Sequence, residues 1–154
     1  MDRVDDFEAF VVDVEPRLRR ALVAAYGPER GREATAEALA WAWEHWQRCR
    51  SMEHPVAFLF RVGQSRSRRR KEGVLPWVDS VSAPWIEPKL ATALTQLTPN
   101  QRVSVVLVHG FQWHLREVAE LLGIKTTTVQ SHVERGLAHL HHALEGASHD
   151  RPAH

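Results

Sequence analysis

The chain has 154 residues, of which 44% are hydrophobic, and a formal net charge of +1. This length suits one ordinary domain or two small ones, and the near-neutral total charge does not by itself indicate nucleic-acid binding. The single cysteine, Cys49, excludes an internal disulfide and a cysteine-based zinc site. We expect a cytoplasmic protein that does not enter a membrane, because there is no signal-peptide pattern and no apolar run near membrane-spanning length.

The charges are distributed unevenly along the chain. Residues 1–16 contain six acidic side chains against Arg3, whereas residues 48–71 contain eight basic side chains against Glu53. Such local asymmetry is more informative than the total charge. The basic stretch ends in QSRSRRRK, and closely spaced arginines repel one another unless an anion compensates them. The stretch therefore predicts contact with nucleic acid, with a solvated helix end as the alternative.

The amino-terminal half predicts three helices. Residues 5–26 carry a wide apolar stripe, and Pro16 is expected to split or kink this helix. A second helix is expected over residues 29–48. A third begins at Pro55, whose missing N–H costs little in a first turn, and turns strongly basic towards Lys71.

Three tryptophans, Trp41, Trp43 and Trp46, lie within the second predicted helix. They cannot all face one core, because consecutive helical positions point in different directions. Two interpretations of Trp43 stay open: it packs on a neighbouring helix of its own domain, or it anchors a protein partner, as large aromatic side chains often do.

Residues 72–88 predict a Pro-rich linker between a helical domain at 1–71 and a second one at 89–146, which a tail at 147–154 follows. The second domain should begin with a short helix over residues 89–97. Thr98 then predicts the N-cap of another helix, with Pro99 in its first turn and Gln101 completing a capping box. The run Val105–Val108 would also fit a strand, but the cap and the length favour a helix.

Residues 114–140 predict a helix-turn-helix. Two apolar stripes of helical spacing flank Gly123, which suits the left-handed conformation after a helix end. Thr126 or Thr127 is expected to cap the second helix, whose first residues would read base edges in a DNA major groove. The candidate DNA-binding residues here are Lys125, Thr127, Thr128, Gln130, Ser131, His132 and Arg135. A helical hairpin that only packs is the alternative.

An enzyme is the least expected class, and we expect neither a cofactor nor a metal. The histidines near the carboxy terminus match no known ligand pattern with carboxylate or cysteine partners, and His141 and His142 are adjacent, so they face different ways on a helix. No nucleophile elbow and no paired carboxylates are visible. The whole chain is predicted to be all-α, with two small helical domains and a carboxy-terminal helix-turn-helix.

With these helices and the linker in this order, the chain resembles the extracytoplasmic-function group of bacterial RNA polymerase sigma factors. GREATAEALAWAWEHW is similar to the acidic, aromatic helix of sigma region 2, and HPVAFLFRVGQSRSRRRK is similar to the helix that follows it. LTPNQRVSVVLVHGFQWHLREVAELLGIKTTTVQSHVERGLAHL looks like region 4. The chain departs from the family pattern at Ala36, Gly63 and Leu137, and its second region 2 helix has fewer apolar residues among the basic ones.

The resemblance implies partners and roles. Core RNA polymerase would bind Glu33, Glu37, Trp43 and Glu44. Promoter DNA would meet region 4 at the −35 element and the basic helix at the −10 element, through Arg61, Arg66, Arg68, Arg69 and Arg70. An anti-sigma protein is a further implied partner. Two other interpretations stay open, a stand-alone regulator with a LuxR-type helix-turn-helix and a sigma-like protein-interaction module that does not initiate transcription.

Overall fold

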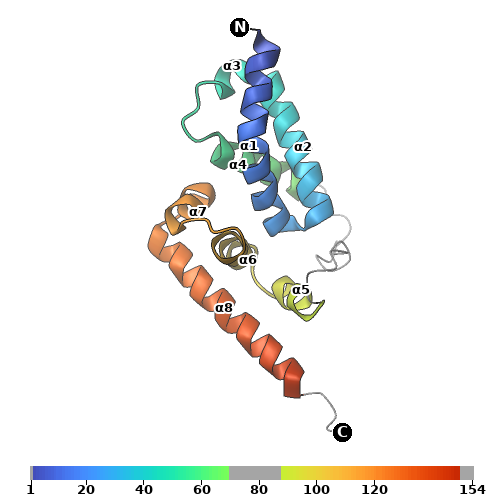
Figure 1. Cartoon of the computed structure of the whole chain (residues 1–154), viewed down its shortest axis with the longest axis vertical. Coiled ribbons are helices and arrows are strands. Elements are labelled where there is room, and N and C mark those ends of the chain that lie inside the picture. The colour runs from blue at the N-terminus through green and yellow to red at the C-terminus, as the bar shows by residue number, and fades with distance from the viewer. Residues whose placement is uncertain (1, 70–87, 150–154) are drawn as a thin grey trace. The chain divides into compact units, whose positions relative to one another are not determined.

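The computed structural model describes residues 2–69 and 88–149, without the side chains of residues 68, 69, 88 and 147–149. The described ranges are helical and contain no strand, which confirms the predicted all-α class (Figure 1). The chain divides into two compact units, Met1–Val74 and Leu75–His154. The predicted linker at 72–88 lies outside the described residues except for Pro88, and the tail does so from residue 150, so the domain boundaries stay a prediction.

Helix α1 spans Arg3–Tyr26 and continues through Pro16, so the predicted split is wrong. A proline removes the hydrogen bond to the carbonyl four residues earlier, which here belongs to Val12. Val12 is 77% exposed, so water can reach that carbonyl and replace the lost donor. The buried face of α1 is the predicted apolar stripe, with Val14, Leu18 and Leu22 almost inaccessible to solvent.

Helix α2 spans Pro28–Glu44 and packs along α1. The two backbones come close together, because a Cβ built on Gly31 would lie 2.5 Å from the Cα of Val23. Beyond Gly31 the buried positions of α2 carry small side chains, Ala34, Ala38 and Ala42. Small residues thus let α2 approach α1 at this separation.

The prediction of one continuous helix over residues 29–48 is wrong at its carboxy-terminal end. Helix α2 stops at Glu44, His45 adopts φ −114° and ψ 36°, and a short helix α3 covers Trp46–Cys49. The Nδ1 of His45 lies 2.9 Å from the carbonyl oxygen of Trp41, to which it can donate when protonated. The change of direction turns Trp46 into the core, where it is 4% exposed and packs edge-on against Phe10.

Helix α4 spans Pro55–Arg69 and contacts both α1 and α2. Leu59 and Phe60 fill the core of this unit. Gly63, which departs from the family pattern, is buried, and a Cβ there would lie 2.9 Å from a methyl group of Leu22. Close packing therefore explains a residue that is otherwise a poor helix former.

The second unit begins with α5 (Pro88–Thr95) and α6 (Pro99–Val105). The predicted capping box of α6 is confirmed. The Thr98 hydroxyl accepts a hydrogen bond from the Gln101 N–H at 3.2 Å, and the Gln101 side chain accepts one from the Thr98 N–H at 3.3 Å. The last turn becomes the π-helical segment η1 (Val106–Gly110), so the helical interpretation of the run at 105–108 is also confirmed.

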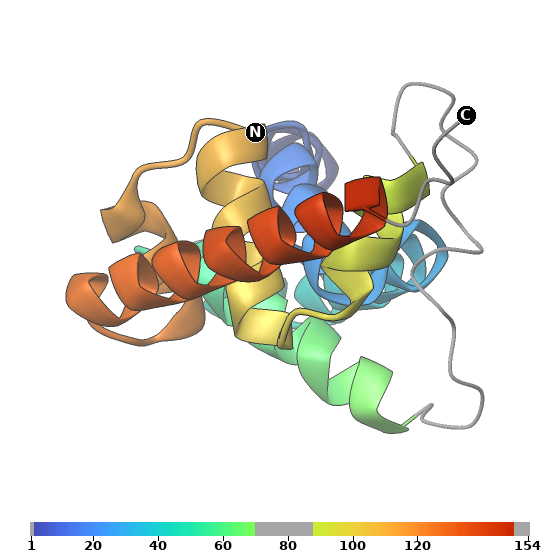
Figure 2. The same ribbon diagram turned by 90° about the horizontal axis from the view of Figure 1, so that it is seen from below.

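The long helix α8 (Thr126–His149) crosses α5 and α6 and closes the core of this unit (Figure 2). Its Leu140 packs in a cluster with Leu94, Leu97 and Val105. A Cβ on Gly136 would lie 2.6 Å from a methyl group of Val105, so α6 and α8 also meet at a glycine. Burial of each leucine stabilises the unit by roughly 1.5–3 kcal/mol.

Gly31→Ala is expected to lower the melting temperature, because overpacking against a backbone costs about 1–3 kcal/mol or more and outweighs the roughly 1 kcal/mol that alanine gains in helix propensity. Gly63→Ala should cost less, since its new methyl meets only a side-chain tip. Gly146→Ala, which meets nothing within 4 Å, should be neutral or stabilising. Thermal unfolding of the three variants measures this order, and a Gly31→Ala variant as stable as Gly146→Ala would contradict the close α1–α2 packing.

Candidate functional site

The helix-turn-helix of the second unit consists of α7 (Leu115–Leu122), a tight turn, and the amino-terminal half of α8. Gly123 is left-handed, with φ 68° and ψ 35°, and the Ile124 N–H donates to the carbonyl of Ala119 at 3.0 Å. This pattern satisfies the last carbonyls of α7 and turns the chain into α8. The predicted glycine turn is confirmed.

Local signals and packing together orient the two helices. The carboxylate of Glu117 accepts a hydrogen bond from the His114 N–H at 3.0 Å, and an acidic residue also suits the positive end of the α7 dipole. Val118 of α7 and Val129 of α8 are both fully buried. With Val129 and Val133 facing inward, α8 has one rotational setting and presents a defined polar face.

That polar face carries most of the predicted DNA-binding residues. The exposed residues among them are Lys125, Thr127, Thr128, Gln130, Ser131 and Arg135. His132 departs from the prediction, since it is half-buried and its Nδ1 is enclosed with no hydrogen-bond partner among the described residues. The Gln130 side chain donates to the Glu134 carboxylate at 3.4 Å, so a contact with a base would exchange this weak bond for another.

The predicted cap of the second helix is wrong. Helix α8 already begins at Thr126, and the carbonyl of Lys125 accepts the first helical bonds, from the N–H groups of Thr128 and Val129. Lys125 therefore stands at the N-cap position. Thr126 and Thr127 lie inside the first turn, and both are exposed.

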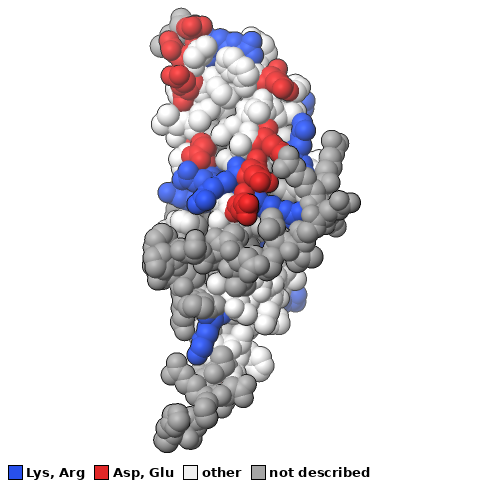
Figure 3. Space-filling view, turned by 90° about the vertical axis from the view of Figure 1, so that its right-hand side faces the viewer, with Lys and Arg blue, Asp and Glu red and all other residues white. Residues whose placement is uncertain are grey.

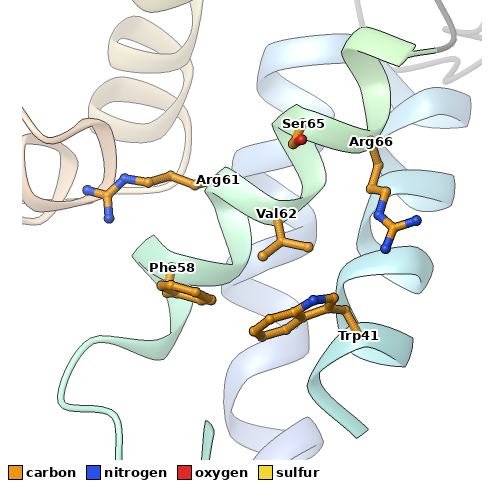
Figure 4. Close-up of a pocket in the computed structure, with 6 residues that line it drawn as sticks. All are labelled: Trp41, Phe58, Arg61, Val62, Ser65 and Arg66. Carbon is orange, nitrogen blue, oxygen red and sulfur yellow. The ribbon is translucent and has the colours of Figure 1, made fainter. Parts of the chain in front are cut away.

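The first unit has an aromatic and basic pocket of about 320 Å³ between α2 and α4 (Figure 4). Six residues line it: Trp41, Phe58, Arg61, Val62, Ser65 and Arg66. The two aromatic ring centroids are 5.3 Å apart and the rings are tilted by 40°. The Arg66 side chain runs from α4 towards α2 above the indole, whereas Arg61 points away on the other side. Aromatic surfaces beside cations suit an unstacked base and its phosphates.

Further contacts extend this aromatic surface. The imidazole of His45 stacks on Trp41 with centroids 4.2 Å apart and only 16° between the planes. The Arg48 guanidinium lies 5.2 Å from the centre of the Phe58 ring. Sequence reasoning singled out none of these four residues for binding. The four-residue spacing of Trp41 and His45 on one helix was the available signal.

The predicted basic residues are only partly described. Arg61 and Arg66 are exposed and line the pocket. The side chains of Arg68 and Arg69 are not described, and Arg70 lies outside the described residues.

A second, smaller pocket brings the predicted polymerase-binding and DNA-binding residues together. It is lined by Arg30, Glu33, Ala34, Glu37, Arg66 and Ser67. Arg66 therefore borders both pockets, with the aromatic surface on one side and two glutamates on the other. Figure 3 shows the same mixing on a larger scale, with acidic and basic side chains side by side on one face.

Trp43 packs on a neighbouring helix of its own unit, which was one of the two interpretations that the sequence left open. Its role as an anchor for a partner stays a prediction. Its ring packs edge-on against Phe7 of α1, with centroids 5.0 Å apart, yet the residue is 37% exposed. Glu44, the next residue, is also exposed.

Residues 2–69 and 88–149 contain no group of three or more histidine, cysteine or acidic side chains that could hold a metal ion. None of the helices in those ranges is both long and apolar enough to cross a membrane. Cys49 is buried, and this burial raises the pKa of its thiol, while the charge of Arg48 acts in the opposite direction.

Comparison with known proteins identifies the second unit. Residues 88–140 match the family model described as "Sigma-70, region 4". This part of the chain is therefore similar to a sigma-70 region 4 domain. The match spans α5 to the middle of α8 and so includes the whole helix-turn-helix. No curated protein sequence matches the chain significantly.

A solved structure extends the likeness to nearly the whole chain. It is the co-crystal structure of the sigma factor RpoE in complex with the anti-sigma factor NepR from Bartonella quintana. The match has a TM-score of 0.64 and 22% sequence identity, and covers 91% of this chain and 97% of the other. The chain thus has the fold of a sigma factor, with a match to region 4 in its second unit, and the predicted resemblance is confirmed.

Proposed function

We propose that this chain is a sigma factor of the extracytoplasmic-function type, which binds core RNA polymerase and directs it to promoters. The observation that carries the proposal is a region 4 helix-turn-helix on a chain whose likeness to a sigma factor covers both units. A stand-alone LuxR-type regulator would not need the first unit. The proposed role is regulatory rather than enzymatic, and it is exercised in the cytoplasm, where polymerase and promoter DNA are found.

In the second unit, the exposed face of α8 reads the −35 element. Arg135 and Gln130 have the donors that recognise guanine and adenine edges, and the threonines at 127 and 128 offer methyl groups and hydroxyls. Lys125, at the beginning of the helix, contacts a phosphate. His132 supports the helix packing as much as it contacts DNA, because it is half-buried.

In the first unit, the pocket between α2 and α4 accepts an unstacked base of the −10 element. The Trp41 and Phe58 rings provide stacking surfaces, and Arg61 and Arg66 neutralise the adjoining phosphates. Unstacking a base costs a few kcal/mol, which is least when the strand is already single. Arg68, Arg69 and Arg70, whose side chains are outside the described part of the structure, are also proposed to contact DNA.

The polymerase contacts lie on α2. Glu33, Glu37 and Glu44 recur at spacings of four and seven residues, so they share one side of the helix, and Trp43 adds an apolar anchor beside them. A partner with basic and apolar residues fits this surface. An anti-sigma protein is included among the proposed partners, because the similar RpoE was crystallised with one.

The chain is expected to co-elute with bacterial core RNA polymerase on a sizing column, and Trp43→Ala should abolish most of this co-elution. The matched control is Val12→Ala, which trims another exposed apolar residue of the same unit and should leave co-elution intact. Separate elution of the unaltered chain would contradict the proposed function. A Trp43→Ala variant that melts much earlier yet still binds would instead make Trp43 a packing residue.

Arg135→Ala should weaken binding to −35-type duplex DNA by roughly 1–3 kcal/mol if the guanidinium contacts a base. Lys89→Ala removes the same charge from an exposed position of the same unit and should have little effect. Fluorescence anisotropy at two salt concentrations measures both variants, since phosphate contacts alone would change mainly the salt dependence. Equal affinities of the two variants on every sequence tried would refute the assignment of the recognition helix.

Phe58→Leu should weaken binding to a single-stranded −10 oligonucleotide by about 1–3 kcal/mol, the range measured for stacking of one base on an aromatic ring. Leucine keeps the apolar bulk, so the fold should survive, which thermal unfolding checks. Phe111→Leu serves as control, because Phe111 is an exposed aromatic residue of the other unit. Undiminished binding by Phe58→Leu would rule out the pocket as a base-binding site.

A further inference from the structure

The guanidinium of Arg3 makes two contacts with Trp43, although the two residues are 40 positions apart. Its Nη2 donates a hydrogen bond to the carbonyl oxygen of Trp43 at 2.9 Å. Its Cζ also lies 4.5 Å from the centre of the indole ring, a cation–π distance. One side chain of α1 therefore contacts both the backbone and the ring of Trp43.

This hydrogen bond reaches the carboxy-terminal end of α2, where a positive charge is favourable. The last four carbonyls of a helix lack helical partners, and their end of the helix dipole is negative. Helix α2 has no basic residue in its last turn and ends in the acidic Glu44. Arg3 supplies the missing positive charge from α1, and so stabilises the end of the helix that carries Trp43.

The ring is held on another side by Phe7, one turn further along α1. Trp43 nevertheless remains 37% exposed, and Val4, which follows Arg3 in the first turn of α1, is 46% exposed. The orientation of this exposed indole is thus set by two residues of α1. A contact that restricts the orientation of an anchor side chain before binding lowers the entropy that the anchor loses on binding.

We propose that Arg3 is a positioning residue for the polymerase-binding surface, which holds Trp43 in the orientation that the partner requires. The inference rests on the proposed function, because it takes Trp43 as an anchor for core RNA polymerase. It extends the surface from α2 to the amino-terminal turn of α1. Arginine suits the role because its planar guanidinium can donate a hydrogen bond and cover an aromatic face at the same time.

The experiment compares three substitutions in the full chain by titration against core RNA polymerase. Arg3→Ala should weaken binding about five-fold, and Arg3→Lys should recover part of the loss, since lysine keeps the charge but not the planar face. Arg19→Ala is the matched control. It removes an arginine from the same helix and breaks the partly exposed 2.8 Å ion pair with Glu15, and it should leave affinity unchanged. In a Trp43→Ala background, Arg3→Ala should have no further effect.

A second readout does not depend on polymerase. The chain labelled with 5-fluorotryptophan contains six tryptophans, and a Trp43→Phe variant assigns the Trp43 fluorine signal. Arg3→Ala should shift or broaden that signal, whereas Arg19→Ala should not. A Trp43 signal that stays unchanged in Arg3→Ala would overturn the positioning role.

The outcomes separate this inference from the function on which it rests. Failure of the unaltered chain to bind polymerase would refute the proposed function, and the polymerase part of the inference with it. Tight binding by both the unaltered chain and Arg3→Ala would overturn only the inference. Tighter binding by Arg3→Ala would also overturn it, because Arg3 would then cover the anchor instead of presenting it.

Discussion

The amino-terminal unit depends on the close approach of α1 and α2 at Gly31. The backbone of Val23 occupies the space that any side chain at this position would need. Because the helices are so near, the side chains along the buried face of α2 are small, namely three alanines and Thr35. Large residues are therefore displaced to the flanks of α2, where Trp41 meets Phe58 of α4 and Trp43 meets α1. The tight contact thus sets where both candidate surfaces of this unit lie.

In the second unit, local conformation rather than a close helix contact sets the arrangement of the helix-turn-helix. Its helix-turn-helix is defined by local conformation, with a left-handed glycine and a carboxylate that bonds the first turn of α7. The buried valines 118 and 129 then fix how α8 is rotated about its axis. A recognition face needs this rotation to be fixed, because a shift by one residue would turn the polar side chains by about 100°. The residues of α8 that pack in the core and those proposed to recognise DNA thus lie on opposite sides of this helix.

Arg66 of the basic helix α4 lies between acidic and aromatic side chains. In the sequence, the arginines of this helix stand where the family has more apolar residues. In the folded unit, Arg66 borders a small pocket with Glu33 and Glu37 and also lines the aromatic pocket. Arg66 thus stands near two acidic residues of α2, and Arg30 lines the same small pocket. The proposed polymerase and DNA contacts of this unit consequently adjoin one another at this small pocket.

The sequence by itself determined the features that depend on residues close together in the chain. The helical class, the capping box at Thr98 and the turn at Gly123 all follow from signals within a few positions, and each was predicted. Two wrong predictions, at His45 and at the beginning of α8, concern helix ends. The position of a helix end depends on single residues, and the spacing of apolar residues does not indicate it. The tertiary structure alone decided that Trp41 and Phe58 line one pocket and that Arg3 holds Trp43. These contacts join different helices, so they depend on how closely the helices pack, which the spacing of residues along the chain does not specify.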